Sequence, residues 1–167
     1  MIANLEQVLL EKISDLETLK CKVEYWKLEG EKVVFTNGVF DLLHIGHITY
    51  MAKAASLGTR FIIGLNADAS VKRLKGESRP VNDQANRAAL LAALFFVDGI
   101  VIFEEDTPLN LISTLLPDIL VKGADYTIDN IVGAKEVLAN GGEVKTIDLV
   151  EGYSSTSIIE RIRNQAS

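Results

Sequence analysis

Cysteine is almost absent from this chain of 167 residues, which contains Cys21 and no other. A single cysteine excludes an intrachain disulfide and a metal site built from several thiolates. The first residues also lack a basic segment followed by an apolar run and a small-residue cleavage site, so no export is expected. Both observations favour a protein of the reducing cytoplasm.

Long hydrophobic runs and an excess of positive charge are missing as well. The longest uninterrupted apolar run, residues 88–97, has about half the length of a membrane-spanning helix, which predicts a buried helix and no membrane partner. A net charge of −6 argues against binding to nucleic acid, because such proteins normally carry a basic patch. A small anionic substrate is still compatible, since a few lysines and backbone N–H groups can hold a phosphate.

What is present is the composition of an ordinary globular domain, with 48% hydrophobic and 24% charged residues. Residues 2–20 place apolar side chains at spacings of one, three and four, which predicts an amphipathic helix. This helix would either pack on its own domain or pair with a second subunit, and we expect a homodimer or higher homo-oligomer. We expect residues 1–29 to be a helical extension and residues 30–167 the main domain.

From residue 31 onwards, short apolar strand candidates alternate with helical segments. The predicted strands are KVVFT, RFIIGLN, GIVIF, DILVK and EVKTIDL, and the predicted helices cover residues 45–57, 83–95, 108–115, 130–140 and 155–163. Strands that are apolar on both faces and separated by helices indicate a parallel sheet covered on both sides. The sequence therefore predicts an α/β fold with a Rossmann-like, doubly wound, parallel five-stranded sheet.

In such a fold the ligand binds beyond the carboxyl ends of the strands, where the strand order reverses. The strand ends correspond to residues 36–47, 66–80, 122–126 and 152–157. Residues 68–83 are polar and too long for a simple connector, so we interpret them as a functional loop.

Both histidines of the chain follow the first predicted strand. Gly38 would let the backbone turn, and the N–H groups that open the next helix would form an anion site. His44 and His47 are three residues apart and so project from one face of that turn, while Gly46 leaves room for a ligand to approach. Two imidazoles can donate hydrogen bonds to phosphate oxygens on which negative charge builds.

Two other interpretations of this pair compete with a phosphate site. A lone histidine among apolar residues is usually a satisfied core residue, but two of them at a strand end favour a ligand site. A metal pair is less favoured, because the sequence offers no cysteine cluster and no third histidine to complete a zinc site. We therefore expect no metal ligands here.

The segment HIGH after TNGVFDLL resembles the HxGH signature of the nucleotidyltransferase superfamily, which includes cytidylyltransferases, adenylyltransferases and class I aminoacyl-tRNA synthetases. Later segments make the resemblance more specific. In order along the chain, NADASVKRLKGESRPVN, FEEDTP, LPDILVKGADY, EVLANGGEV and YSSTSII resemble the adenylyltransferase domain of the bacterial heptose 1-phosphate enzymes. The resemblance covers about residues 30–165 and implies the HxGH nucleotidyltransferase fold; in many bacteria this domain is fused behind a sugar kinase.

The resemblance implies transfer of AMP from ATP to D-glycero-β-D-manno-heptose 1-phosphate, giving ADP-heptose and pyrophosphate for lipopolysaccharide or surface-glycan synthesis. The sugar phosphate would displace pyrophosphate directly, so positioning and charge neutralisation should dominate catalysis. ATP would arrive with Mg²⁺, held mostly by phosphate oxygens and water.

The resemblance also implies roles for residues at the strand ends. The catalytic residues would be His44 and His47, which stabilise the transition state, and Lys75, which closes over the triphosphate. The nucleotide would contact Thr36, Asn37, Gly38, Phe40, Gly46, Lys122, Gly123, Asp125, Ser154, Ser155 and Thr156. The acceptor would contact Asn66, Asp68, Arg79 and Arg87.

Several of these residues have a structural alternative. Asp68 could orient the loop, and arginines at a helix start, such as Arg87, often form ion pairs. Hydroxyls of residues 154–156 could cap the last helix. Lys72 and Arg73 are weaker candidates for the phosphate contact of Lys75, and Asp41 could brace the turn before His44.

Other activities are compatible with the HxGH turn. Glycerol 3-phosphate cytidylyltransferases carry RTEG before the serine and threonine motif, where this chain has residues 149–152 with the sequence LVEG. That difference disfavours this subfamily and CTP. An archaeal-type FAD synthetase is a further alternative. A non-catalytic nucleotide-binding module is disfavoured, because both histidines and Lys75 are present.

Overall fold

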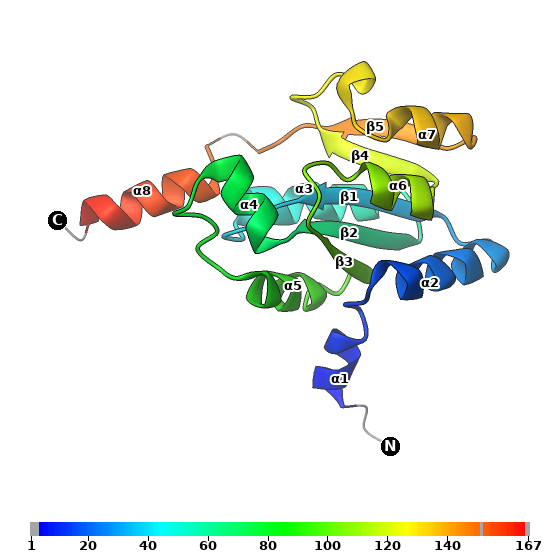
Figure 1. Ribbon diagram of the computed structural model, residues 1–167, viewed down its shortest axis with the longest axis horizontal. Coiled ribbons are helices and arrows are strands. Elements are labelled where there is room, and N and C mark those ends of the chain that lie inside the picture. The colour runs from blue at the N-terminus through cyan, green and yellow to red at the C-terminus, as the bar shows by residue number, and fades with distance from the viewer. Residues whose placement is uncertain (1–3, 151, 166–167) are drawn as a thin grey trace.

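The computed structural model describes residues 4–150 and 152–165, and within them five strands form one parallel sheet in the order β3-β2-β1-β4-β5 (Figure 1). The strands are β1 (Val33–Gly38), β2 (Arg60–Asn66), β3 (Gly99–Phe103), β4 (Ile119–Gly123) and β5 (Glu143–Ile147). The chain order reverses between β1 and β4, which pair in parallel. The predicted doubly wound five-stranded sheet is confirmed.

Helices cover both faces of the sheet because successive strand side chains alternate between two apolar clusters. On one face, α3 (Ile45–Ala55) and α5 (Gln84–Ala92) pack against residues such as Val34 and Ile63. On the other face, α2 (Leu16–Leu28), α6 (Leu109–Leu115) and α7 (Ala134–Ala139) pack against residues such as Phe35 and Ile62. A short 3-10 helix, η1 (Ile128–Asn130), follows β4.

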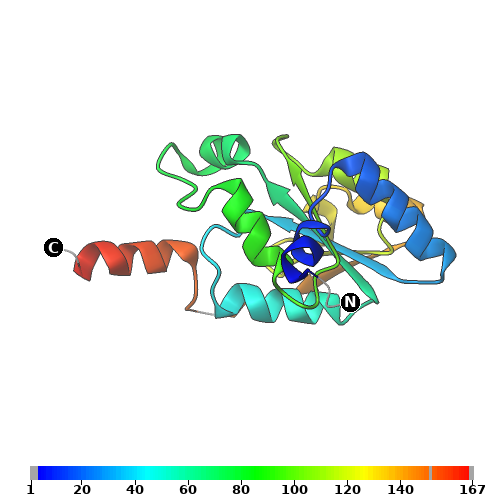
Figure 2. The ribbon, with the colours of Figure 1, turned by 90° about the horizontal axis from the view of Figure 1, so that it is seen from below.

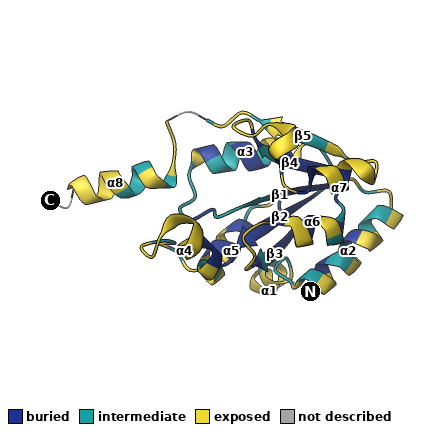
Figure 3. Cartoon of the chain, turned by 45° about the horizontal axis from the view of Figure 1, so that its top comes forward, coloured by how far each residue is buried: buried dark blue, intermediate teal, exposed yellow. Residues whose placement is uncertain are grey.

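The last helix, α8 (Ser155–Gln165), extends away from the sheet (Figures 1 and 2). It has no buried residue among those described, in contrast to strands β1 to β4, which form the dark interior of Figure 3. Its first turn is nevertheless tied to the domain, because the Ser155 hydroxyl donates to the carbonyl of Leu42 at 3.0 Å. Among the described residues, no helix combines the length and the apolarity that crossing a membrane requires.

The prediction of one helix over residues 2–20 is wrong. Residues 2 and 3 lie outside the described residues, and the remainder forms α1 (Leu5–Leu10) and the separate helix α2. Between them, Ile13 forms a parallel bridge with Ile100 on the edge strand β3. Asp15 then caps α2 by accepting a hydrogen bond from the backbone N–H of Thr18 at 2.7 Å. Pairing with the sheet edge and this cap interrupt the helical periodicity.

The prediction of a loop over residues 68–83 is wrong for its first half, which forms α4 (Asp68–Lys75). Within this helix, Ser70 and Val71 are buried. Cationic residues occupy its last turn, where their positive charges interact favourably with the negative end of the helix dipole. The helix ends at Gly76, which has a φ of 92°. Lys75 is therefore the last residue of a helix and not part of a loop.

Helix α2 contributes to the core, since Leu19 and Val23 are buried in the same cluster as Phe35 of β1. Leu19 also occupies the space above Gly99, where an added Cβ would lie 2.8 Å from its Cδ1 atom. We expect Leu19→Ala to lower the free energy of unfolding by about 2–5 kcal/mol, because it leaves a cavity in the core. Tyr25→Ala on the exposed side of α2 is the matched control and should change stability little. Equal effects in denaturant titrations would contradict the packing of α2 described here.

Candidate functional site

A cleft of about 700 Å³ opens at the carboxyl ends of β1 and β4, where the strand order reverses. Most of the residues assigned from the sequence meet in it. They are Asn37, Gly38, Phe40, His44, Gly46, His47, Asn66, Lys75, Lys122, Gly123, Asp125, Ser154, Ser155 and Thr156. Residues from strand ends far apart in the sequence therefore face one cavity.

The two imidazoles form a stacked pair at the start of α3. Their ring centroids lie 3.8 Å apart with an interplanar angle of 25°, and His44 is the N-cap residue of the helix. Phe40 packs edge-on against His47 at a centroid distance of 5.3 Å. The Nδ1 atom of His44 is buried and has no hydrogen-bond partner within the described part of the chain. The pair is packed between α3 and Phe40 and retains hydrogen-bonding capacity.

Gly38 and Gly46 have roles other than those predicted from the sequence, which were to let the backbone turn and to leave room for a ligand. A Cβ atom on Gly46 would lie 3.0 Å from Cε1 and Nδ1 of His44, so the space is filled by that imidazole and not kept free for a ligand. A Cβ atom on Gly38 would likewise lie 2.9 Å from the ring of Phe40. The turn itself is made by Phe40, whose φ of 46° is unfavourable for a bulky side chain. Both glycines make room for the rings that build the site.

Burial lowers the pKa of His44, and burial together with the neighbouring His44 lowers the pKa of His47 to about 4. Both imidazoles are therefore neutral near neutral pH, and each has an N–H to donate. Burial also lowers the pKa of Lys122 to about 8, an effect that Asp125 opposes. Burial and then the charge of Arg79 lower the pKa of Lys75. An anion in the cleft would favour the charged form of each group.

Under the β4 side of the cleft, Thr36 and Tyr50 form a buried hydrogen-bond network. The Thr36 hydroxyl donates to the carbonyl of Val121 at 3.0 Å and so accepts from the Tyr50 hydroxyl at 2.8 Å. Thr36 is fully buried. The prediction that Thr36 contacts the nucleotide is therefore wrong for its side chain, which instead joins β1, α3 and β4.

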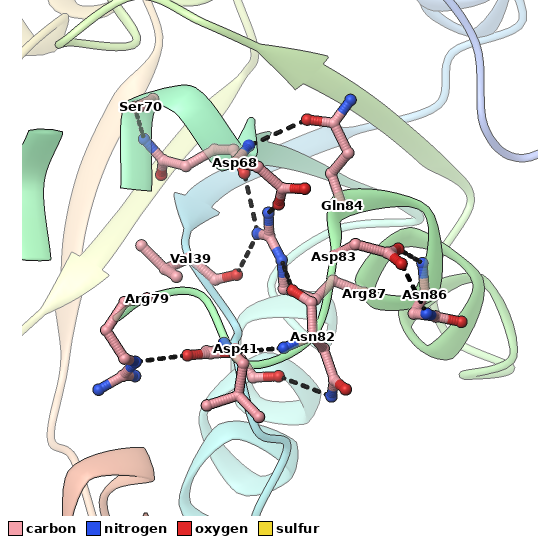
Figure 4. A network of polar contacts seen from close by, with 12 residues as sticks. Val39, Asp41, Asp68, Ser70, Arg79, Asn82, Asp83, Gln84, Asn86 and Arg87 are labelled. Carbon is pink, nitrogen blue, oxygen red and sulfur yellow. Dashed lines mark hydrogen bonds and ion pairs between the residues drawn. The ribbon is translucent and has the colours of Figure 1, made fainter. Parts of the chain in front are cut away.

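The predicted acceptor contact of Arg87 is wrong, because its side chain is completely buried. Figure 4 shows it lying among Val39, Asp68 and Asn82. It donates to the carbonyls of Val39 at 2.7 Å, Asn66 at 2.8 Å and Asn82 at 3.0 Å. Its Nη2 atom pairs with Asp68 at 2.6 Å. Asp68 does not line the cleft either, so the alternative roles are the correct ones: Arg87 is a structural ion-pair residue, and Asp68 orients the chain after β2.

Arg79 also lies outside the cleft lining, where the sequence predicted an acceptor contact. Its Nε atom pairs with Asp41 at 2.6 Å, which confirms that Asp41 braces the turn before His44. Arg73 pairs with Asp106 at 2.8 Å and with the carbonyl of Glu104, so it connects α4 to the segment after β3 instead of facing the cleft. Lys75 lines the cleft from the end of α4.

Of the hydroxyls at the start of α8, that of Ser154 has the capping role that formed the alternative interpretation, whereas that of Ser155 makes a different contact. Ser154 accepts a hydrogen bond from the backbone N–H of Ser157 at 3.0 Å, as an N-cap residue does. The Ser155 hydroxyl donates its hydrogen bond to the carbonyl of Leu42. Both residues still line the cleft, as does the exposed Thr156.

Sequence reasoning missed part of the lining. The missed residues include Tyr50, Asp106, Thr107, Pro108, Asn130, Ile131, Val132, Leu149 and Tyr153. Tyr50 lies three residues after His47, and residues 106–108 follow β3, so helical spacing and the strand-end rule could have indicated them. Leu149 and Tyr153 follow β5, so the strand-end rule could have indicated them too, whereas Asn130, Ile131 and Val132 lie farther beyond the end of β4. No group of three or more His, Cys, Asp or Glu side chains that could hold a metal ion occurs among the described residues.

The cytidylyltransferase-like family model matches residues 35–161. Proteins named bifunctional protein HldE are similar over a longer stretch. The protein from Histophilus somni is 54% identical over 151 residues, which is 90% of this chain and 32% of that protein. The one from Mesorhizobium japonicum is 57% identical over 151 residues, covering 90% of this chain and 30% of the relative. The chain thus spans about a third of the length of these relatives.

Two solved structures share the architecture. The lipopolysaccharide core biosynthesis protein from Thermoplasma volcanium is 28% identical with a TM-score of 0.58, covering 74% of this chain and 99% of that one. Pantoate-beta-alanine ligase from Francisella tularensis has a TM-score of 0.58 at 16% identity, covering 92% of this chain and 76% of the ligase. The second likeness shows a shared fold alone.

The lowered pKa of His47 predicts a pH-dependent stability. The unfolded chain would bind a proton near pH 6.5, whereas the folded chain would not until about pH 4. The unfolded state therefore binds more protons in this window, so the free energy of unfolding should fall as the pH falls through it. NMR titration of the two imidazoles should place His47 well below His44 and show its pKa rising when tripolyphosphate is added.

A His44→Asn variant provides the control for this titration. It leaves one imidazole in the chain, which assigns the signal. It should also raise the pKa of His47, because the charge of His44 is one of the effects that lower it. A His47 that titrates at its ordinary value in the free protein would contradict the burial described here.

Proposed function

The chain belongs to the cytidylyltransferase-like family, and from this membership we propose that it is an adenylyltransferase acting on a sugar phosphate. In the proposed reaction, AMP passes from ATP to the phosphate of D-glycero-β-D-manno-heptose 1-phosphate, which gives ADP-heptose and pyrophosphate. The product would supply lipopolysaccharide or surface-glycan synthesis from the cytoplasm.

The observation that carries the proposal is the stacked pair of His44 and His47 in one cleft with Lys75 and Lys122. Hydrogen-bond donors and lysines that converge on one cavity suit a polyphosphate. The acceptor is supported by the resemblance of KRLKGESRPVN and YSSTSII to heptose 1-phosphate enzymes. The name of the Thermoplasma volcanium protein, which refers to lipopolysaccharide core biosynthesis, is consistent with that pathway.

In the proposed mechanism, an oxygen of the sugar phosphate attacks the α-phosphorus of ATP, and a new P–O bond forms. The bond from that phosphorus to the bridging oxygen of the β-phosphate breaks, and pyrophosphate leaves with the electron pair. The attacking phosphate is already ionised, so the chain need not supply a general base. His44 and His47 would donate hydrogen bonds to the α-phosphate oxygens, and Lys75 and Lys122 would neutralise the triphosphate.

Two further elements belong to this proposal. ATP would bring Mg²⁺, held mostly by phosphate oxygens and water, which would withdraw charge from the leaving pyrophosphate.

The enzyme would form a homodimer or higher homo-oligomer, for which exposed apolar residues of α1, such as Leu5 and Leu10, offer a contact surface.

Pyrophosphate release over a small matrix of substrates tests the proposed function. ATP and CTP, each with Mg²⁺, would be combined with heptose 1-phosphate, glycerol 3-phosphate and riboflavin 5′-phosphate. We expect the highest kcat/KM for ATP with heptose 1-phosphate. Preference for CTP and glycerol 3-phosphate would identify a cytidylyltransferase instead. ATP binding without release from any acceptor would identify a nucleotide-binding module.

Replacement of the histidines tests the mechanism. We expect His44→Ala and His47→Ala each to lower kcat on the order of 10²-fold or more, because each removes a preorganised donor to developing charge. Thermal unfolding would verify that the variants are folded. Unchanged turnover in folded variants would show that the two residues are ordinary core histidines.

A further inference from the structure

A buried ion pair joins the loop before α3 to the segment after α4. Asp41 lies three residues before His44, and its side chain is 1% exposed, while that of Arg79 is 11% exposed. The Nε atom of Arg79 donates to Oδ2 of Asp41 at 2.6 Å (Figure 4). One partner thus precedes the histidine pair, and the other follows Lys75 by four residues.

Asp41 holds more than the arginine. Its Oδ1 atom accepts hydrogen bonds from the backbone N–H groups of Val81 at 2.8 Å and Asn82 at 3.0 Å. The side-chain amide of Asn82 donates to the carbonyl of Asp41 at 3.1 Å. Burial would raise the pKa of Asp41, but these donors and Arg79 lower it overall. Asp41 lies at the wall of the cleft, but both oxygens of its carboxylate already accept hydrogen bonds from residues 79–82.

The end of α4 has little other support. Residues 72–78 are largely exposed, although Lys75 is partly desolvated where it lines the cleft, and a Cβ atom added to Gly76 would meet nothing within 4 Å. The pair of Arg73 and Asp106 is a surface contact, with side chains 49% and 73% exposed, and such pairs contribute little. The attachment of residues 79–82 to Asp41 is a buried restraint on the chain that follows Lys75, and it holds the end nearer to Lys75, whereas the bond from Arg87 holds only the carbonyl of Asn82.

We propose that Asp41 is a positioning residue that holds Lys75 opposite the histidine pair by anchoring residues 79–82, without itself contacting substrate. The proposal deepens the proposed function and rests on it for the role of Lys75 in catalysis. The placement of Lys75 beside His47 can also be measured without substrate, because the charge of Lys75 lowers the pKa of His47.

The variant Asp41→Asn tests this placement. An amide can still accept from the backbone N–H groups of Val81 and Asn82, but it presents no negative charge to Arg79. Arg79 should therefore detach, the hold on residues 79–82 should weaken, and Lys75 should move away from His47. NMR titration should then show the pKa of His47 rising towards the value found in Lys75→Met. Loss of the negative charge of Asp41 alone would lower that pKa, so a rise identifies displacement of Lys75. An unchanged or lowered pKa in the folded variant would overturn the proposal.

Asp98→Asn is the matched control. Asp98 also accepts from an arginine, Arg60 at 3.1 Å, and from a backbone N–H, that of Phe61 at 2.8 Å. It lies at the amino ends of β2 and β3, away from the cleft. Both aspartate variants should be less stable, but Asp98→Asn should leave the pKa of His47 unchanged. If both variants shift it equally, the effect is general loosening and the proposal fails.

Kinetics supply the second readout. We expect Asp41→Asn to lower kcat/KM for ATP by about 10- to 100-fold, while Lys75→Met in the Asp41→Asn background should cost little more. Full additivity of the two changes would overturn the positioning role. Arg79→Met leaves Asp41 bound to Val81 and Asn82, so it should lower kcat/KM for ATP less than Asp41→Asn does. It replaces Asp41→Asn in this experiment if that variant does not fold. A wild-type protein without pyrophosphate release would refute the proposed function, while the His47 titration would still decide the placement of Lys75.

Discussion

The buried guanidinium of Arg87 is the interaction on which the geometry of the cleft depends. A charge that is withdrawn from water must be compensated, and here backbone carbonyls from the ends of β1 and β2 and from the start of α5 converge on it together with Asp68. Because Val39 and Asn66 follow adjacent strands, their carbonyls fix the spacing of the loops that leave the sheet. The histidine pair begins five residues beyond one of these contacts.

Above this buried charge, the cleft is prepared for an anion although the chain as a whole is acidic, with a net charge of −6. The imidazoles are neutral donors, and the pKa values of Lys75 and Lys122 are lowered by burial. Each of these groups would be stabilised in its charged form by a phosphate. The groups that line the cleft, and not the overall charge, thus make it suitable for an anion.

The order of strands and helices was predictable because it depends on local patterns. Apolar runs bounded by polar segments located all of the strands, and the strand-end rule brought His44, Lys75, Lys122 and Ser154 to one place. The N-terminal helix was not predicted correctly, because pairing of Ile13 with the edge of β3 outweighs its helical periodicity. Helix α4 was missed because its burial involves Ser70 and Val71 within an otherwise polar segment.

The sequence by itself determined the fold class, the edge of the sheet at which the cleft opens and the residue types that face it. These follow from periodicity and from motifs that act over a few residues. The tertiary structure alone decided which charged residues reach the cleft and which are used beneath it. Arg79 and Arg87 resemble Lys75 in charge and position along the chain, but burial pairs them with Asp41 and Asp68. A buried charge must be paired with a group that is near in space. Proximity between residues 38 positions apart, as for Arg79 and Asp41, or 19 apart, as for Arg87 and Asp68, is not encoded in any local pattern.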